Sequence, residues 1–255
     1  MQKNLMKAKL LAGKPVFGVT MMFPAPQIVE MLGALGFDWI LIDCEHGTFS
    51  LESVEMMAMA AEVSGLTPLA RPLLNSPQAI LQVMERGVMG VQVPHVNTAT
   101  EAKQAVEAVK YFPLGQRGLA AGTRPATYGL QLSTADYIQE ANRETLVCIQ
   151  LEEKQALEHL DELLHVEGVD VLFLGPSDLS QSLGVPGQVQ DPSVREAMAD
   201  AFHRIGKAGK IAGSAGAPEA IHEYRQQGAH YLYTHLPTLL ARASAAFFAG
   251  NLRDE

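Results

Sequence analysis

Cysteine, aromatic residues and positive charge are all scarce in this sequence of 255 residues. The two cysteines, Cys44 and Cys148, lie in separate apolar runs without CxxC spacing, which excludes a disulfide framework and a zinc ribbon. Basic residues number 19 against 28 acidic ones, and the formal charge of -9 opposes binding to nucleic acid. No window approaches the roughly 18 uninterrupted apolar residues that a membrane helix needs.

Residues 1–15 also lack the apolar stretch and small-residue cleavage site of a signal peptide. With no disulfide pattern, this predicts a soluble protein of the reducing cytoplasm. Hydrophobic residues make up 47% of the chain, enough to bury a core without disulfides or structural metals. We expect a single domain over residues 1–255 that binds neither nucleic acid nor a membrane.

Eight short runs rich in Val, Ile and Leu alternate with longer segments of helical spacing. Most runs are continuously apolar, as expected for parallel strands covered on both faces. The predicted strands are Val16–Met21, Trp39–Asp43, Thr67–Arg71, Gly90–Val93, Leu146–Leu151, Val169–Leu174, Ile211–Ser214 and Tyr231–Tyr233. The predicted helices are 25–35, 51–63, 77–87, 102–109, 154–164, 192–208, 218–227 and 237–249.

Eight strand–helix repeats over this length predict an α/β fold of the (β/α)8 TIM-barrel class, whose active sites lie at the carboxyl ends of the strands. The long interval 111–143, which contains FPLGQRGLAAGTRPATYG, is the exception to the repeat. A loop of that length is usually functional or a surface for a partner.

Two strand ends carry candidate catalytic groups. The second strand leads into Asp43-Cys44-Glu45-His46, where His46 has the chemistry of a general base beside carboxylates. The third ends at Arg71, which would neutralise an anionic substrate or a developing oxyanion at the barrel mouth. The alternatives are that His46 only caps a loop and that Arg71 only forms a structural ion pair.

Two further strand ends carry candidate metal ligands. The fifth leads into Gln150-Leu151-Glu152 and the sixth into Gly175-Pro176-Ser177-Asp178. Adjacent strands would bring Glu152 and Asp178 together as hard oxygen ligands for Mg²⁺ or Mn²⁺ with open positions. The turn at 175–178 would offer backbone N–H groups to a carboxylate. Alternatively, Glu152 is an exposed residue that opens a helix.

A base, a cation and a two-carboxylate metal pair on one barrel face together suggest enolate chemistry on an α-keto acid. His95 and His235 also follow strand ends and are candidates for the wall of a substrate pocket, although a structural role is the simpler interpretation.

Six segments match a known family in order and spacing: DCEH, LARPLLNSP, VQVPHVNTATEA, FPLGQRG, QLEEKQALE and LGPSDLS. With them, essentially the whole chain resembles the metal-dependent class II pyruvate aldolases of the HpcH/HpaI aldolase/citrate lyase family. The resemblance implies a TIM barrel of the phosphoenolpyruvate/pyruvate type and a hexamer with an exchanged C-terminal helix. It also implies reversible cleavage of a 4-hydroxy-2-oxo acid to pyruvate and an aldehyde, through a pyruvate enolate stabilised by a divalent cation, Mg²⁺ or Mn²⁺, with Co²⁺ or Zn²⁺ as further candidates.

The resemblance also assigns roles to individual residues. The catalytic set is His46 as the base, Arg71 as the enolate stabiliser and Glu85, at the position of an aspartate that supports the histidine from a neighbouring subunit. The pyruvyl group is held by Gln150 and the backbone at Ser177, and Arg117 belongs to a loop near the site. The metal ligands are Glu152 and Asp178.

Departures from the family pattern concern Cys44 and Ser177, which replace a common Gly and Ala, and the segments GSAGAP and YLYTHLP, which affect specificity for the aldehyde. Two other classes remain open: an acyl-CoA lyase of the citrate lyase β-subunit type, and a barrel that binds small acids without catalysis. Decarboxylation of oxaloacetate would use the same enolate. A phosphate site at GSAGAP is a weaker alternative.

Overall fold

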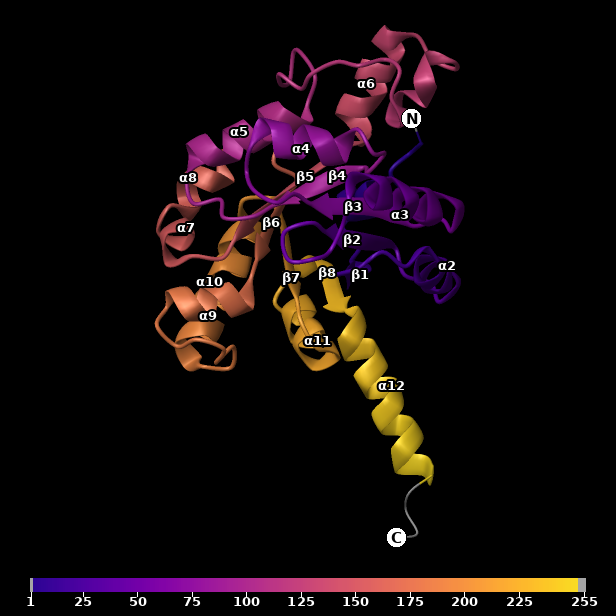
Figure 1. The fold of residues 1–255 in the computed structure, drawn as a ribbon. Helices are drawn as coiled ribbons and strands as arrows, with labels where there is room; N and C mark the ends of the chain where they lie inside the picture. Colours follow the sequence, from indigo (N-terminus) through magenta and orange to yellow (C-terminus); the bar gives the residue numbers. More distant parts are fainter. Residues whose placement is uncertain (1, 252–255) are drawn as a thin grey trace.

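Eight parallel strands close into a barrel in sequence order, with β8 paired to β1. The computed structural model describes residues 2–251, and Figure 1 shows the helices arranged around the strands. The strands are β1 (Val16–Met21), β2 (Trp39–Asp43), β3 (Thr67–Arg71), β4 (Gly90–Val93), β5 (Leu146–Leu151), β6 (Val171–Leu174), β7 (Ile211–Ala215) and β8 (Ala229–His235). The predicted (β/α)8 fold is confirmed, and the predicted strands differ only at the ends of the last three.

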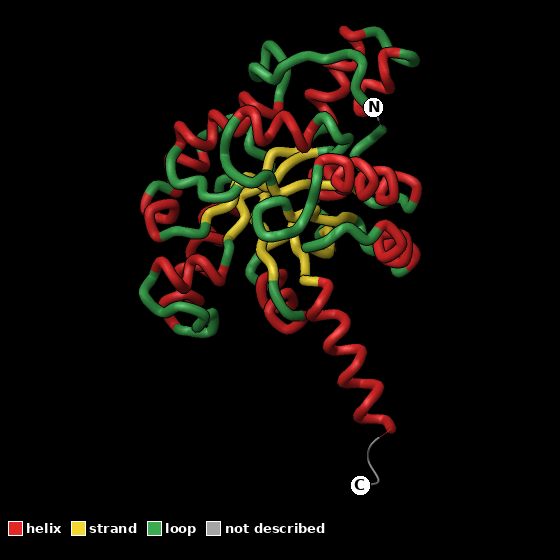
Figure 2. The backbone as a smooth tube through the Cα atoms, in the orientation of Figure 1, coloured by secondary structure: helices red, strands yellow, loops and turns green. Residues whose placement is uncertain are grey.

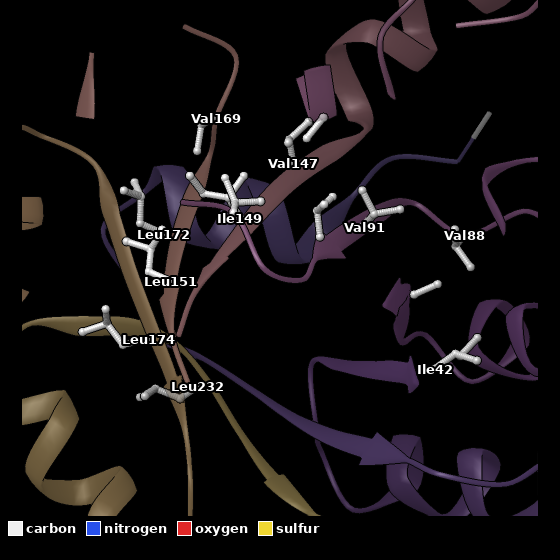
Figure 3. Packing of buried hydrophobic residues seen from close by; sticks show 14 of the residues in the cluster. Ile42, Val88, Val91, Val147, Ile149, Leu151, Val169, Leu172, Leu174 and Leu232 are labelled. Carbon is white, nitrogen blue, oxygen red and sulfur yellow. The ribbon is translucent and has the colours of Figure 1, made fainter. Parts of the chain in front are cut away.

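Side chains along each strand alternate between the barrel interior and the helical layer. On β5, Cys148 packs in the interior cluster, whereas Val147 and Ile149 pack under the helices. Figure 3 shows this outer cluster. Because both faces are buried, the strands read as continuous apolar runs. The interior is wide enough for Trp39 only because residue 18 is glycine, since a Cβ there would overlap the indole ring.

The helical layer follows the predicted spacing with two differences besides the exact ends of the helices. Residues 154–164 form two short helices that meet at His159, and the predicted turn after β6 is the start of a helix. The helices around the barrel are α2 (Pro26–Ala34), α3 (Leu51–Val63), α4 (Pro77–Met84), α5 (Ala99–Val109), α7 (Lys154–Glu158), α8 (Leu160–Leu164), α9 (Pro176–Ser182), α10 (Pro192–Lys207) and α11 (Pro218–Gln226). No helix within residues 2–251 combines the length and apolar character needed to cross a membrane.

A helix that the sequence pattern does not reveal, α1 (Leu5–Leu11), joins the core of the barrel. Its buried Met6 and Leu10 belong to the interior cluster of the barrel. Asn4 caps the helix through its side chain and also donates to the carbonyl of Glu144, before β5. Helix α1 thereby packs at the amino end of the barrel.

Two segments lie apart from the barrel (Figures 1 and 2). The long interval between β4 and β5 folds into a 3-10 helix, η1 (Arg124–Gly129), and α6 (Thr134–Glu144). The last helix, α12 (Leu236–Asn251), extends away from the barrel as a rod. Only its first residue, Leu236, is buried, and Phe247 and Phe248 are exposed.

Candidate active site

A cavity of about 510 Å³ opens at the carboxyl ends of the strands. Five predicted site residues line it: His46, Arg71, Gln150, Ser177 and Asp178. The other lining residues are Phe173, Gly175, Pro176, Val189, Gln190, Ala215, Gly216, Ala217, Ala220, Tyr224, Tyr233 and His235. The predicted groups therefore meet at one face of the barrel.

Arg71 is held at the mouth by two carboxylates. Strand register places it directly beside Asp43, and the two form a bidentate pair, Nε to Oδ1 at 2.9 Å and Nη2 to Oδ2 at 2.5 Å. Glu45 Oε2 lies 3.1 Å from Nη1. Burial opposes the charged guanidinium, but the hydrogen bond to Asp43 and the nearby carboxylates outweigh it and raise the pKa of Arg71. Arg71 is thus both in an ion pair and exposed to the cavity, a fixed positive charge.

Hydrogen bonding fixes the backbone of His46, whereas its imidazole ring is exposed. Asp43 Oδ1 accepts hydrogen bonds from the backbone N–H groups of Glu45 and His46, which fixes the loop after β2. The His46 side chain is 58% exposed, and its Nε2 lies 3.7 Å from Glu45 Oε2. An imidazole so placed is free to approach a bound substrate as a base.

Glu152 does not line the cavity and is buried behind Gln150, which does. Only 2% of the residue is exposed. Its carboxylate accepts hydrogen bonds from the Gln150 side chain and from the backbone N–H of His95, the latter at 2.8 Å. Burial raises the pKa of Glu152, and the charge of Asp178 acts in the same direction. Asp178 is therefore near enough for its charge to act on Glu152.

His95 is a mouth residue for which the sequence favoured a structural role. Its Nε2 lies 3.3 Å from Glu45 Oε1, and its Nδ1 lies 3.2 Å from Glu152 Oε1 and 3.1 Å from Glu153 Oε1. Burial lowers its pKa, but these carboxylates outweigh burial and the pKa of His95 is raised. A positive φ of 51° directs the backbone N–H of His95 toward Glu152. The sequence feature that could have identified His95 as a site residue is its position just after β4.

The mouth carries more carboxylates than permanent cations. The carboxylates Asp43 and Glu152 are buried, and Glu45 and Asp178 lie near them. Among the residues that line the cavity, Arg71 is the side chain with a permanent positive charge. Within residues 2–251, no cluster of three or more His, Cys, Asp or Glu is arranged to hold a metal ion. Glu152 and Asp178 alone suit a cation that completes its shell with water or substrate oxygens, as Mg²⁺ and Mn²⁺ do.

Ser177 and Asp178 lie in the first turn of α9, not in the predicted isolated turn. Pro176 begins the helix, where its missing N–H costs no hydrogen bond. Ser177 and Asp178 keep their places on the cavity wall. His235 also lines the cavity, and burial and the charge of Arg71 lower its pKa, which favours the neutral imidazole.

Glu85 and Arg117 lie elsewhere. Arg117 Nη2 donates to Glu85 Oε1 at 2.8 Å, and the guanidinium lies over the Tyr111 ring, 4.7 Å from its centroid. Neither residue lines the cavity, and no hydrogen bond or ion pair within the described chain joins Glu85 to His46. The buried Glu85 Oε2 has no hydrogen-bond partner in the described residues.

Comparisons with known proteins identify the family of this chain. A family model described as HpcH/HpaI aldolase/citrate lyase matches residues 20–234. The 4-hydroxy-2-oxo-heptane-1,7-dioate aldolase of Shigella sonnei (strain Ss046) is 36% identical over 249 residues, 97% of this chain and 94% of that protein.

Two solved structures are similar over nearly their whole length. An HpcH/HpaI aldolase/citrate lyase family protein from Burkholderia cenocepacia J2315 superposes with a TM-score of 0.91 at 27% identity, covering 97% of this chain and 99% of that one. An HpcH/HpaI aldolase from Desulfitobacterium hafniense DCB-2 gives a TM-score of 0.90 at 28% identity, covering 100% and 98%.

Proposed function

This chain belongs to the HpcH/HpaI aldolase/citrate lyase family and is a carbon–carbon lyase, and from that premise we propose that it is a class II pyruvate aldolase. Its reaction is the reversible cleavage of a 4-hydroxy-2-oxo acid to pyruvate and an aldehyde. The observation that carries the proposal is the cavity that Arg71, His46 and Asp178 line, with the buried Glu152 bonded to a fourth lining residue, Gln150.

The pyruvyl half of the substrate binds at the floor of the cavity. Gln150 and the backbone N–H of Ser177 hold its carboxylate, and Arg71 faces the carbonyl oxygen. Glu152 and Asp178 are the residues that would hold a divalent cation, Mg²⁺ or Mn²⁺. When bound, that cation supplies a Lewis acid that polarises the carbonyl of the keto acid. No lysine is among the described residues lining the cavity, so the chain offers no amine there for a Schiff base.

His46 transfers the proton. In the cleavage direction, its neutral imidazole removes the proton of the C4 hydroxyl, and the C3–C4 bond breaks as the aldehyde carbonyl forms. The bonding electrons pass to the pyruvyl half, whose developing oxyanion is stabilised by the Arg71 guanidinium. Transfer of that proton from His46 to the enolate carbon then gives pyruvate and restores the base. In the synthetic direction the same steps run in reverse.

The oligomer is part of the proposal. Helix α12 contacts β8 and β1 at its start and otherwise leaves Leu240, Phe247 and Phe248 exposed, an apolar surface on a rod that extends from the barrel. We infer that a second copy of this chain covers this surface by helix exchange, in a hexamer. The same assembly would let Glu85, whose Oε2 has no hydrogen-bond partner among residues 2–251, support His46 of a neighbouring subunit.

The proposal is tested by release of pyruvate from a 4-hydroxy-2-oxo acid, followed through reduction of the pyruvate by lactate dehydrogenase. Activity should disappear after treatment with a chelator and return with Mg²⁺ or Mn²⁺. Glu152→Gln and Asp178→Asn should each lose cation binding, measured by calorimetry, together with activity. Glu158→Gln, on exposed α7, is the matched control. Full activity of either ligand variant, or cleavage of an acyl-CoA substrate instead, would contradict the proposal.

A further inference from the structure

We propose that Gln92 and Tyr231, two side chains buried inside the barrel, are positioning residues that orient Gln150 and, through it, Glu152. The inference rests on the proposed function, since it concerns the residues that hold pyruvate and the cation. Neither Gln92 nor Tyr231 lines the cavity, so they act through their neighbours rather than by touching substrate.

The basis is an unbroken hydrogen-bonded chain across the barrel. Tyr231 OH donates to Gln92 Oε1 at 3.1 Å. Gln92 Nε2 donates to Gln150 Oε1 at 2.5 Å. Gln150 Nε2 then donates to Glu152 Oε2. The chain starts on β8, crosses to β4 and ends just after β5, and its first bond directly joins residues 139 positions apart in sequence.

Every donor in this chain points toward the carboxylate. Gln150 presents its NH₂ group to Glu152 and its carbonyl oxygen to Gln92. Gln92 must then present its own NH₂ group, and its oxygen is left to accept from Tyr231. Burial raises the pKa of Tyr231 well above its usual range, which keeps the phenol protonated and able to donate. One orientation of each amide therefore gives all four side chains of the chain a hydrogen-bond partner.

The position of the chain argues against an incidental contact. Gln92 and Tyr231 are completely buried and Gln150 is 2% exposed. Around them the interior is apolar, with Leu41, Leu69 and other members of the same cluster. Buried amides cost stability unless every donor and acceptor is paired. Gln92 meets this condition because its second N–H bonds Tyr233 OH at 3.3 Å.

The consequence for pyruvate is the orientation of one amide group. One N–H of Gln150 is used by Glu152, and the side chain also lines the cavity. The second N–H is left for the carboxylate of the substrate. If the amide rotated by half a turn, its oxygen would oppose both Glu152 and the substrate carboxylate. Gln92 prevents this rotation because it offers a donor where only the oxygen of Gln150 can accept.

The test uses variants that keep shape and remove hydrogen bonds. Gln92→Met is nearly isosteric and removes both of its donors, and Tyr231→Phe removes only the hydroxyl. We expect Gln92→Met to raise the pyruvate KM for metal-dependent methyl exchange, and the pyruvate Kd of the Mn²⁺-loaded protein, by about tenfold. Tyr231→Phe should raise both about threefold, since one hydrogen bond at the far end is lost. The kcat should change by less than these factors.

A double variant separates positioning from general damage. If Tyr231 acts through Gln92, the double variant Gln92→Met/Tyr231→Phe should have the same pyruvate Kd as Gln92→Met alone. Tyr137→Phe is the control, because it removes an equally buried hydroxyl that pairs with Tyr111 outside the barrel site. It should leave pyruvate Kd unchanged. If Gln92→Met does not fold, the comparison of Tyr231→Phe with Tyr137→Phe decides the matter.

Wild-type protein is assayed first in the same exchange experiment. If it catalyses no exchange with any cation, the proposed function fails before the variants are considered. If it does, and Gln92→Met and Tyr231→Phe bind pyruvate as wild type does, the positioning role is overturned. Strictly additive losses in the double variant would likewise overturn the proposed route from Tyr231 through Gln92.

Discussion

Replacing Asp43 by asparagine should destabilise the fold and the site together. Asp43 is fully buried, and its two oxygens take both ends of the Arg71 fork at 2.9 and 2.5 Å. Asparagine can still accept hydrogen bonds from the backbone of Glu45 and His46, but it removes the charge that compensates Arg71. The change is therefore chiefly electrostatic, with little loss of volume.

The cost follows from leaving a guanidinium with a single carboxylate in a buried position. Removing one partner of a buried ion pair typically costs about 3–5 kcal/mol. Glu45 Oε2, 3.1 Å from Arg71 Nη1, remains as partial compensation, so we expect the lower end, about 3 kcal/mol. For a chain of this size that corresponds to a fall in Tm of roughly 6–12 °C.

Urea unfolding followed by tryptophan fluorescence measures the effect at fixed protein concentration. The chain has one tryptophan, Trp39, which is fully buried on the strand that carries Asp43. Glu223→Gln is the matched control because it removes the carboxylate of an exposed pair, 2.6 Å from Arg195. Its expected cost is about 1 kcal/mol or less. Equal free energies of unfolding for the two variants would refute the reasoning about burial.

Three further results are expected. Arg71→Ala should remove most pyruvate exchange while leaving Mn²⁺ binding measurable by calorimetry; exchange at the wild-type rate would remove Arg71 from the mechanism. Burial and the nearby charge of Lys7 lower the pKa of Lys110 to about 8, so the unfolded chain binds the extra proton and the free energy of unfolding should rise between about pH 8 and 10. Lys110→Met should flatten that rise, and an unchanged pH profile would contradict the assignment. Replacing Phe247 and Phe248 together by serine should lower the oligomer mass in light scattering, whereas Leu130→Ser, also exposed, should not; an unchanged mass would argue against exchange of α12.

The strands were predictable because both faces of each are buried, so apolar runs end where the chain reaches the polar mouth. Helix α6 was missed for the opposite reason: its residues are mostly exposed, and among its members only Tyr137 and Ala141 are buried. Helix α1 carries just two buried side chains and its cap bonds to a segment 140 residues away. The periodicity of apolar residues is therefore too weak to predict either α1 or α6.

The site residues at strand ends were predictable because barrel topology brings those ends together. Contacts across the interior were not, since the pairing of Gln92 with Tyr231 and of His95 with Glu45 depends on closure of the barrel. The sequence also gives no sign that Arg117 lies against Glu85 in the same subunit. The sequence pattern of one chain likewise does not predict which residues a neighbouring copy adds to the site.

The central claim is that this barrel forms the enolate of pyruvate with a divalent cation. Proton exchange at the pyruvate methyl group in D₂O, followed by NMR, tests it without any choice of aldehyde. Protein stripped with EDTA should be inactive, and Mg²⁺ or Mn²⁺ should restore exchange in wild type but not in Glu152→Gln. Absence of exchange with every cation would contradict the claim, as would exchange that persists undiminished in EDTA.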